Sequence, residues 1–443
     1  MGRLNAGGTQ LRIVFHIEEG DDGVLTGTLD SPDQGATGIP LGEISGSGSS
    51  ITIQLPAVAG TYEGTIETDR SAIEGTWSQG GGTLPLRLEP ADDESIRLPD
   101  RPQQPRPPYP YIEEEVGFDN THADIRLAGT LTIPEGDGPF PAAILISGSG
   151  PQNRDEALLG HRPFHVLADY MTRKGIAVLR YDDRGIAEST GDFATATSVD
   201  FAEDASAAVD FLKGRSEIDS ERIGLVGHSE GGLIAPVVAA DRDDLGYIVL
   251  MAGPGVTGEE ILYEQGAVIL RAGGADEERI ASNRATQEAM FEIAMSDAPL
   301  DEVREKLRAF LVQTVEGMDE QERTASGLSE AMIEPQVQQV ASPWMRFFLS
   351  YDPRPTLEKV TCPTLVINGE KDLQVPPYQN LPEIERALTK GGNTNFRIVE
   401  MEGLNHLFQT SETGAPSEYA AIEETFSPKA MQVIADWILN DAS

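Results

Sequence analysis

The stretch IGLVGHSEGG, from Ile223 to Gly232, constrains the fold of this chain more than any other. A short apolar run, typical of a buried strand, leads directly into Gly-His-Ser-Glu-Gly, a pattern that holds a serine on a sharp turn between a strand and a helix. That turn needs neighbours without side chains, and Gly227 and Gly231 flank Ser229 at the required positions. The motif predicts a strand, a turn and a helix here, with Ser229 as the candidate nucleophile.

Apolar strands and amphipathic helices alternate on both sides of this motif. Buried strands are expected at PAAILIS, IAVLRY, YIVLM and PTLVING, and helices at PFHVLADYMTRKG, FAEDASAAVDFLKGR, LPEIERALTK and PKAMQVIADWIL. Continuous apolar strands bounded by helices are typical of a parallel sheet that is covered on both faces. We therefore expect an α/β-hydrolase fold with a mostly parallel sheet over residues 112–443. Residues from about 256 to 355 show helical periodicity and are too many for a loop, so we expect a helical cap insertion.

The first part of the chain has a different pattern. Short segments such as LRIVFHIEE, SITIQL and IEGTWSQGG alternate apolar and polar residues between turn residues, which predicts a small antiparallel all-β domain, either a sandwich or an open barrel, over residues 1–98. The proline-rich residues 99–111 favour an extended, semi-rigid linker.

Charge excludes some partners. The chain has 33 basic and 73 acidic residues, a formal net charge of -40, and such a surface repels nucleic acid and anionic membranes. An adaptation to saline surroundings and a generally acidic proteome both remain open as its origin. No apolar stretch reaches the length of a membrane span. Cys362 is the only cysteine, so no intramolecular disulfide is expected.

A nucleophilic serine needs a base and an acid that orients the base. In the α/β-hydrolase fold these follow the nucleophile in the order serine, acid, histidine, and His406 is the only histidine after Ser229. The acid is expected after the strand PTLVING, where Asp372 is favoured over Glu370 because it lies in the turn beyond the strand end. The candidate catalytic residues are therefore Ser229, Asp372 and His406.

An oxyanion hole requires two N–H donors. The N–H of Glu230, directly after the nucleophile, is one, and the loop after PAAILI supplies the other, with Ser149 as first choice and Gly148 and Gly150 beside it.

Other polar clusters are expected to be structural. His161 and His165 stand four apart on a predicted helix, but no third ligand is near in sequence, so we predict no metal site and no cofactor. Arg184 is expected to fix its loop together with Asp182 or Asp183.

These motifs resemble a known group. ISGSGPQNRDE, YDDRGIAESTGDF, GLVGHSEGG, INGEKDLQVPP and GLNHLFQ occur in the order typical of bacterial α/β-hydrolase esterases with an N-terminal β domain, and the resemblance runs from about residue 112 to the end. It implies a serine carboxylesterase with Ser229, Asp372 and His406 as its triad and the insertion as a cap. Such esterases commonly have His-Gly-Ser-Gly where this chain has Ser147-Gly148-Ser149-Gly150, which puts the rigidity of the oxyanion loop in doubt.

The leading hypothesis is hydrolysis of small carboxylic esters with short to medium acyl chains. An acyl-CoA thioesterase or acyltransferase, a peptidase or amidase, and a non-catalytic binding protein on the same fold remain as alternatives. The resemblance leaves the location open. The protein is either exported, with a signal peptide that the printed sequence does not include, or cytoplasmic. The oligomeric state does not follow from the sequence.

Overall fold

A computed structural model describes residues 1–6, 9–20, 23–32, 36–58, 60–79, 82–92, 100–318, 328 and 330–442. These residues divide into two compact units. Unit 1 comprises Met1–Asp100, Leu158–Gly160 and Ser296–Ala341, and unit 2 comprises Arg101–Ala157, His161–Met295 and Ser342–Ser443. The predicted boundary between residues 98 and 99 lies outside the described residues.

Unit 1 contains two antiparallel sheets. The first has the order β1-β2-β3-β4 and is formed by Gly2–Ala6, Thr9–Glu19, Leu25–Ser31 and Ala36–Pro40. The second has the order β5-β6-β7-β8-β9 and is formed by Ile44–Ser47, Ser50–Leu55, Gly60–Ile66, Ile73–Gln79 and Gly82–Pro85. A short 3-10 helix, η2 (Pro56–Val58), joins β6 to β7.

Both sheets contribute to one core. Ile13 and Leu29 from the first sheet pack in the same cluster as Ile53 and Trp77 from the second. The fully buried Tyr62 donates its hydroxyl hydrogen bond to backbone carbonyls of Ile73 and Leu86. The alternating pattern in the sequence thus corresponds to strands that face this core on one side. Helices α7 (Leu300–Gly317) and α9 (Glu330–Val340) also belong to unit 1 and contact each other.

Unit 2 is built on an eight-stranded sheet with the order β10-β11-β13-β12-β14-β15-β16-β17 among the described residues. Its strands are Tyr111–Asn120, Ile125–Pro134, Phe140–Ile146, Ala177–Tyr181, Ile218–His228, Tyr247–Met251, Thr364–Gly369 and Phe396–Met401, numbered β10 to β17 in chain order. The β10–β11 hairpin and the β11–β13 pair are antiparallel, and every later pair from β13 to β17 is parallel. Strands β13, β15 and β16 are buried along their whole length.

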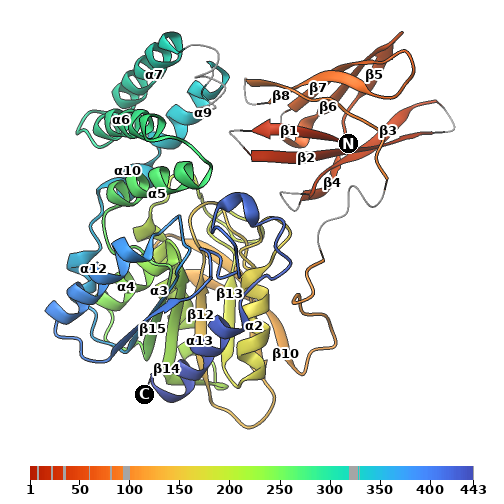
Figure 1. Cartoon of the computed structure of the whole chain (residues 1–443). Helices are drawn as coiled ribbons and strands as arrows, with labels where there is room; N and C mark the ends of the chain where they lie inside the picture. The colour runs from red at the N-terminus through yellow and green to blue at the C-terminus, as the bar shows by residue number, and fades with distance from the viewer. Residues whose placement is uncertain are drawn as a thin grey trace. The chain divides into compact units, whose positions relative to one another are not determined.

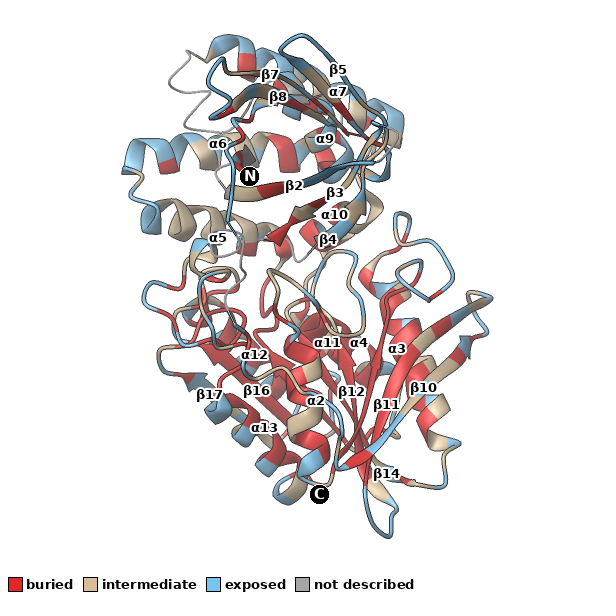
Figure 2. Cartoon of the chain, turned by 90° about the vertical axis from the view of Figure 1, so that its right-hand side faces the viewer, coloured by how far each residue is buried: buried red, intermediate tan, exposed pale blue. Residues whose placement is uncertain are grey.

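Helices cover both faces of this sheet (Figure 1). Side chains of α3 (Ser198–Lys213), α4 (Gly231–Asp241) and α12 (Pro377–Lys390) pack into one core cluster with the sheet, and those of α2 (Pro163–Arg173) and α13 (Pro428–Asn440) pack into the other. Figure 2 shows these strands as the most continuously buried part of the unit. Six of the eight strands follow the parallel doubly covered pattern that the sequence predicts, with β10 and β11 as an antiparallel edge.

The insertion after β15 is helical, as the sequence predicts. Within unit 2 it contains α5 (Gly258–Ala272), α6 (Glu277–Ala294), α10 (Pro343–Ser350) and α11 (Arg354–Leu357), and α5 contacts both α6 and α10. Thr257 and Glu260 form a capping box at the start of α5. A second 3-10 helix, η3 (Pro416–Glu418), lies in the loop after β17.

Part of the proline-rich segment is anchored on unit 2. Arg101 donates hydrogen bonds to the carbonyls of Ala420 and Ile422, and Gln103 exchanges hydrogen bonds with the backbone of Thr425 and Phe426. The division into an accessory domain, a linker and a catalytic domain remains a sequence-based proposal. None of the described helices has the combination of length and apolar character that crossing a membrane would require.

Candidate active site

Ser229 occupies a strained turn at the end of β14. Its φ angle is 53°, a value that residues with side chains rarely adopt, and its N–H donates to the carbonyl of Met251 on β15. A Cβ atom on Gly227 would lie 1.9 Å from the carbonyl oxygen of Gly231, and one on Gly231 would lie 2.2 Å from that of Ile146. Both glycines are therefore required by close backbone approach, and the turn has the form that the motif predicts.

His406 and Asp372 form a buried pair. Asp372 lies in the turn after β16, His406 lies in the loop after β17, and His406 Nδ1 is 2.7 Å from Asp372 Oδ2. The other carboxylate oxygen of Asp372 accepts the N–H groups of Gln374 and Val375, both at 2.8 Å. The exposed Glu370 instead accepts the N–H of Gly403. Of the two acids that the sequence leaves open, Asp372 is the one within hydrogen-bond distance of His406.

Ser229 is linked to this pair only indirectly in the described residues, through its neighbour His228. Within the described part of the chain, no hydrogen bond joins Ser229 Oγ to His406 Nε2. Catalytic hydrogen bonds of this kind are often long or poorly aligned until substrate binds. The link between them runs through His228, whose Nε2 is 3.0 Å from the carbonyl oxygen of His406. Ser229 is half-buried, whereas His406 is 4% exposed and Asp372 is 2% exposed.

The predicted anion-binding N–H groups are only partly available. In the described residues, no hydrogen bond uses the N–H of Glu230 or that of Ser149, so neither donor is committed within the protein. The N–H of Gly148 donates to Glu156 Oε1 at 2.6 Å. The prediction of Gly148 as a further donor is therefore corrected, because a buried carboxylate already occupies its N–H.

Asp183 holds the loop after β12 through both of its carboxylate oxygens. Ser147 Oγ donates to Asp183 Oδ1 at 2.8 Å, and the N–H of Gln152 donates to Asp183 Oδ2 at 2.9 Å. Burial raises the pKa of Asp183 to about 8, although these hydrogen bonds act in the opposite direction. Ser147 stands where the esterases that this chain resembles commonly have a histidine. Its hydrogen bond to Asp183 holds it in place.

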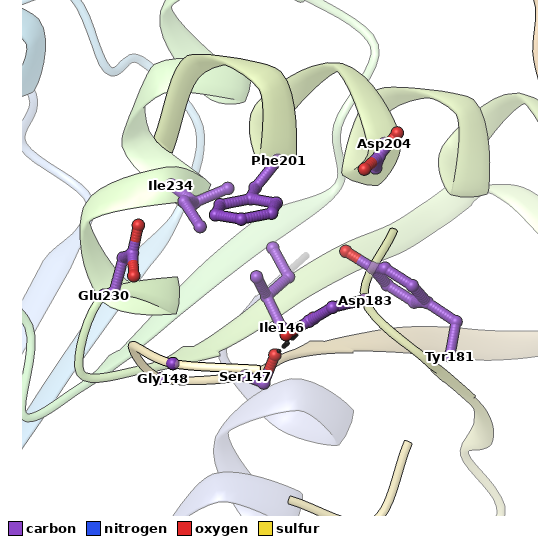
Figure 3. Close-up of a pocket in the computed structure, with 10 residues that line it drawn as sticks. Ile146, Ser147, Gly148, Tyr181, Asp183, Phe201, Asp204, Glu230 and Ile234 are labelled. Atoms are coloured by element: carbon purple, nitrogen blue, oxygen red, sulfur yellow. Dashed lines mark hydrogen bonds between the residues drawn. The ribbon is translucent and has the colours of Figure 1, made fainter. Parts of the chain in front are cut away.

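The side chain of Glu230 points away from its own N–H into the protein. Its Oε1 accepts hydrogen bonds from Ser198 at the start of α3 and from the indole N–H of Trp344 on α10. Glu230, Gly148 and Asp183 line one pocket with the apolar side chains of Phe201 and Ile234 (Figure 3). Burial raises the pKa of Glu230, so this carboxyl favours its neutral form more than an exposed glutamate does.

Two other expectations are wrong. His161 precedes α2 rather than lying within it, because the helix begins only at Pro163, and its ring contacts Thr425 and the carbonyl of Tyr419. Arg184 does not pair with Asp182 or Asp183 but with Asp204 of α3, at 2.7 and 2.9 Å. Asp182 pairs instead with Arg154, since neighbouring side chains of this turn point in different directions.

Sequence patterns predict no role for Glu156 or His228. Both are buried, and Glu156 Oε1 is 2.9 Å from His228 Nδ1. Their only signal in the sequence is that each lies within a motif quoted above. The described residues contain no group of three or more histidine, cysteine or acidic side chains arranged to hold a metal ion.

Comparison with known proteins places this site in a family. The family model described as X-Pro dipeptidyl-peptidase (S15 family) matches residues 122–392, which include Ser229 and Asp372. The chain belongs to the S15 family.

Individual relatives of this S15 chain carry esterase names. Esterase EstD of Thermotoga maritima is 27% identical over 385 residues, which cover 85% of this chain and 79% of that protein. Among solved structures, an esterase of Pyrococcus furiosus gives a TM-score of 0.45 at 15% identity, covering 75% of this chain and 94% of that one. The ferulic-acid-bound Est1E of Butyrivibrio proteoclasticus gives 0.42 at 16% identity, covering 74% and 98%.

The S15 chain is thus a hydrolase with the α/β-hydrolase fold, and it resembles the esterases of that fold, as the sequence predicts.

Proposed function

We propose that this hydrolase is a serine carboxylesterase that acts on small esters with short to medium acyl chains. The observation that carries the proposal is the buried His406–Asp372 pair, at 2.7 Å, in the same unit as a serine held at positive φ on the strand-to-helix turn, whose preceding residue His228 contacts the carbonyl of His406. A serine, an oriented imidazole and free N–H donors are the groups that acyl transfer requires.

The proposed reaction begins with attack of Ser229 Oγ on the ester carbonyl. His406 Nε2 takes the serine proton, since Nδ1 is committed to Asp372. The negative charge that develops on the carbonyl oxygen is stabilised by the N–H groups of Glu230 and Ser149 and by the amino terminus of α4. The protonated His406 then delivers its proton to the leaving alcohol, and water hydrolyses the acyl-enzyme by the same route.

Asp372 orients His406 and stabilises its cation. With both carboxylate oxygens accepting hydrogen bonds, Asp372 is fixed in position and remains ionised through the cycle in this proposal. No metal or organic cofactor enters any step.

A second candidate function is cleavage of X-Pro peptides, because the matching family model carries that description. The esterase proposal takes precedence because the curated relative that matches most of this chain is named an esterase. Thioesters of coenzyme A are less favoured, since a chain with a net charge of -40 offers few cations for the phosphates.

Initial rates test this proposal. We would compare p-nitrophenyl esters from acetate to palmitate with Ala-Pro-p-nitroanilide and with acetyl-CoA. The proposal predicts the highest kcat/KM for esters of short to medium chain length. Faster turnover of the nitroanilide would replace it with peptidase activity, and preference for the thioester would replace it with thioesterase activity.

A further inference from the structure

The pair formed by Glu156 and His228 connects the two loops of the candidate site. His228 directly precedes Ser229, and its two ring nitrogens lie 2.9 Å from Glu156 Oε1 and 3.0 Å from the carbonyl oxygen of His406. Both partners can only accept hydrogen bonds when Glu156 is ionised. In that state His228 donates from both nitrogens, as only the imidazolium cation can.

The charge on His228 has a counter-ion. Burial by itself lowers the pKa of His228, but the nearby Glu156 carboxylate and the carbonyl of His406 outweigh that effect and raise it above its ordinary value. A buried ion pair is costly to form, and removing one partner is strongly destabilising because the other charge stays uncompensated.

Glu156 also reaches the oxyanion loop. The same Oε1 that faces His228 accepts the N–H of Gly148 at 2.6 Å, and Gly148 directly precedes Ser149. A Cβ atom on Gly148 would lie 3.2 Å from the Cβ of Ser229, so this loop passes close to the nucleophile. One carboxylate oxygen therefore ties the loop that supplies an oxyanion donor to the residue before the nucleophile.

We propose that Glu156 and His228 are positioning residues for the proposed esterase reaction. Glu156 fixes the Gly148–Ser149 peptide near Ser229 through the N–H of Gly148. His228 fixes the backbone carbonyl of His406, the residue that carries the proposed base. Nucleophile, base and oxyanion donor are then held by one ion pair. This inference rests on the proposed function.

Kinetics of two variants test the proposal. Glu156→Ala removes the acceptor shared by Gly148 and His228, and we expect kcat to fall about 100-fold, comparable to the loss of an oxyanion donor, with KM within threefold of the wild type. Glu156→Gln keeps a carbonyl oxygen and should recover part of that loss. Circular dichroism and the thermal transition establish that each variant is folded.

A matched control separates this effect from general loop damage. Glu418 also accepts two loop N–H groups, those of Thr413 and Gly414, but among the described residues it has no hydrogen bond to a histidine, so Glu418→Ala should keep kcat within twofold. A folded Glu156→Ala with kcat within threefold of the wild type would overturn the proposal. The proposal would also be overturned if the fall in activity of Glu156→Ala were no larger than the fall in its folded fraction.

The wild-type protein provides a second measurement that needs no folded Glu156 variant. With six histidines, ¹⁵N-histidine labelling is practical, and the resonance of His228 is assigned by its absence in His228→Gln. We expect both ring nitrogens of His228 to carry protons at pH 7. A single proton would contradict the double donation and overturn the proposal, whether or not the wild type hydrolyses esters. An inactive wild type with doubly protonated His228 would instead count against the proposed function alone.

Discussion

Asp372 accepts three hydrogen bonds, one from His406 and two from the N–H groups of Gln374 and Val375. We expect Asp372→Asn to lower kcat by roughly 10³- to 10⁴-fold with little change in KM, because the amide favours the wrong tautomer of His406. Steady-state kinetics on a short p-nitrophenyl ester measures this. Glu370→Gln is the control, since Glu370 only accepts the N–H of Gly403, and it should remain within twofold of the wild type. Equal losses in both variants would contradict the assignment of Asp372.

His161 makes a prediction about acid stability. Burial, with Arg101 as a lesser cause, lowers its pKa from 6.5 to about 4. The neutral His161 contributes its full share of the free energy of unfolding above pH 6.5. As the pH falls toward 4 the unfolded chain binds the proton more readily, and the free energy of unfolding decreases by up to about 3 kcal/mol. Denaturant unfolding of wild type and His161→Gln between pH 7 and 4 should therefore show their stabilities converging as the pH falls. A pH-independent difference would show that His161 does not titrate in this way.

At the scale of elements, the turn between β14 and α4 depends on close backbone packing. Gly227→Ala places a methyl group 1.9 Å from the carbonyl oxygen of Gly231, and we expect it to cost roughly 3 kcal/mol and to abolish activity. Gly317→Ala, at the end of α7, meets no atom of the described residues within 4 Å and should instead be neutral or stabilise by up to about 1 kcal/mol. Thermal unfolding of the two variants compares them. A tolerated Gly227→Ala would mean that the turn can relax.

Helices and strands were the most predictable part of this chain. Continuous apolar runs predict strands β12, β15 and β16, because a strand that is buried on both faces is apolar along its length. Strand β10 was missed, since the run of Glu113, Glu114 and Glu115 hides the alternation of an edge strand.

The triad candidates followed from motif and chain order, whereas their supporting residues did not. The hydrogen bond between Glu156 and His228 spans 72 residues, and only the folded chain brings them together. The same holds for Arg184, whose partner in the sequence was expected beside it but lies on α3. Spacing along a chain specifies neighbours within an element, and packing between elements decides the rest.

At the scale of the whole molecule, the net charge of -40 is the dominant property. Excess charge destabilises a compact state by self-repulsion, and raising the ionic strength from about 0.1 M to 1 M shortens the screening length from about 10 Å to about 3 Å. We expect Tm to rise by several degrees as NaCl increases over this range, measured by differential scanning fluorimetry. The same series in KCl should give the same rise. A Tm that falls or stays constant would show that repulsion does not limit stability.

Ser229 is the nucleophile in the proposed hydrolase reaction. The most direct measurement is mass spectrometry after brief treatment with a p-nitrophenyl alkylphosphonate, applied to the wild type and Ser229→Ala. We predict one adduct in the wild type, on the peptide that contains Ser229, and none in the variant. Equal labelling of both proteins, or an adduct on a different peptide, would contradict the assignment of Ser229 as the nucleophile.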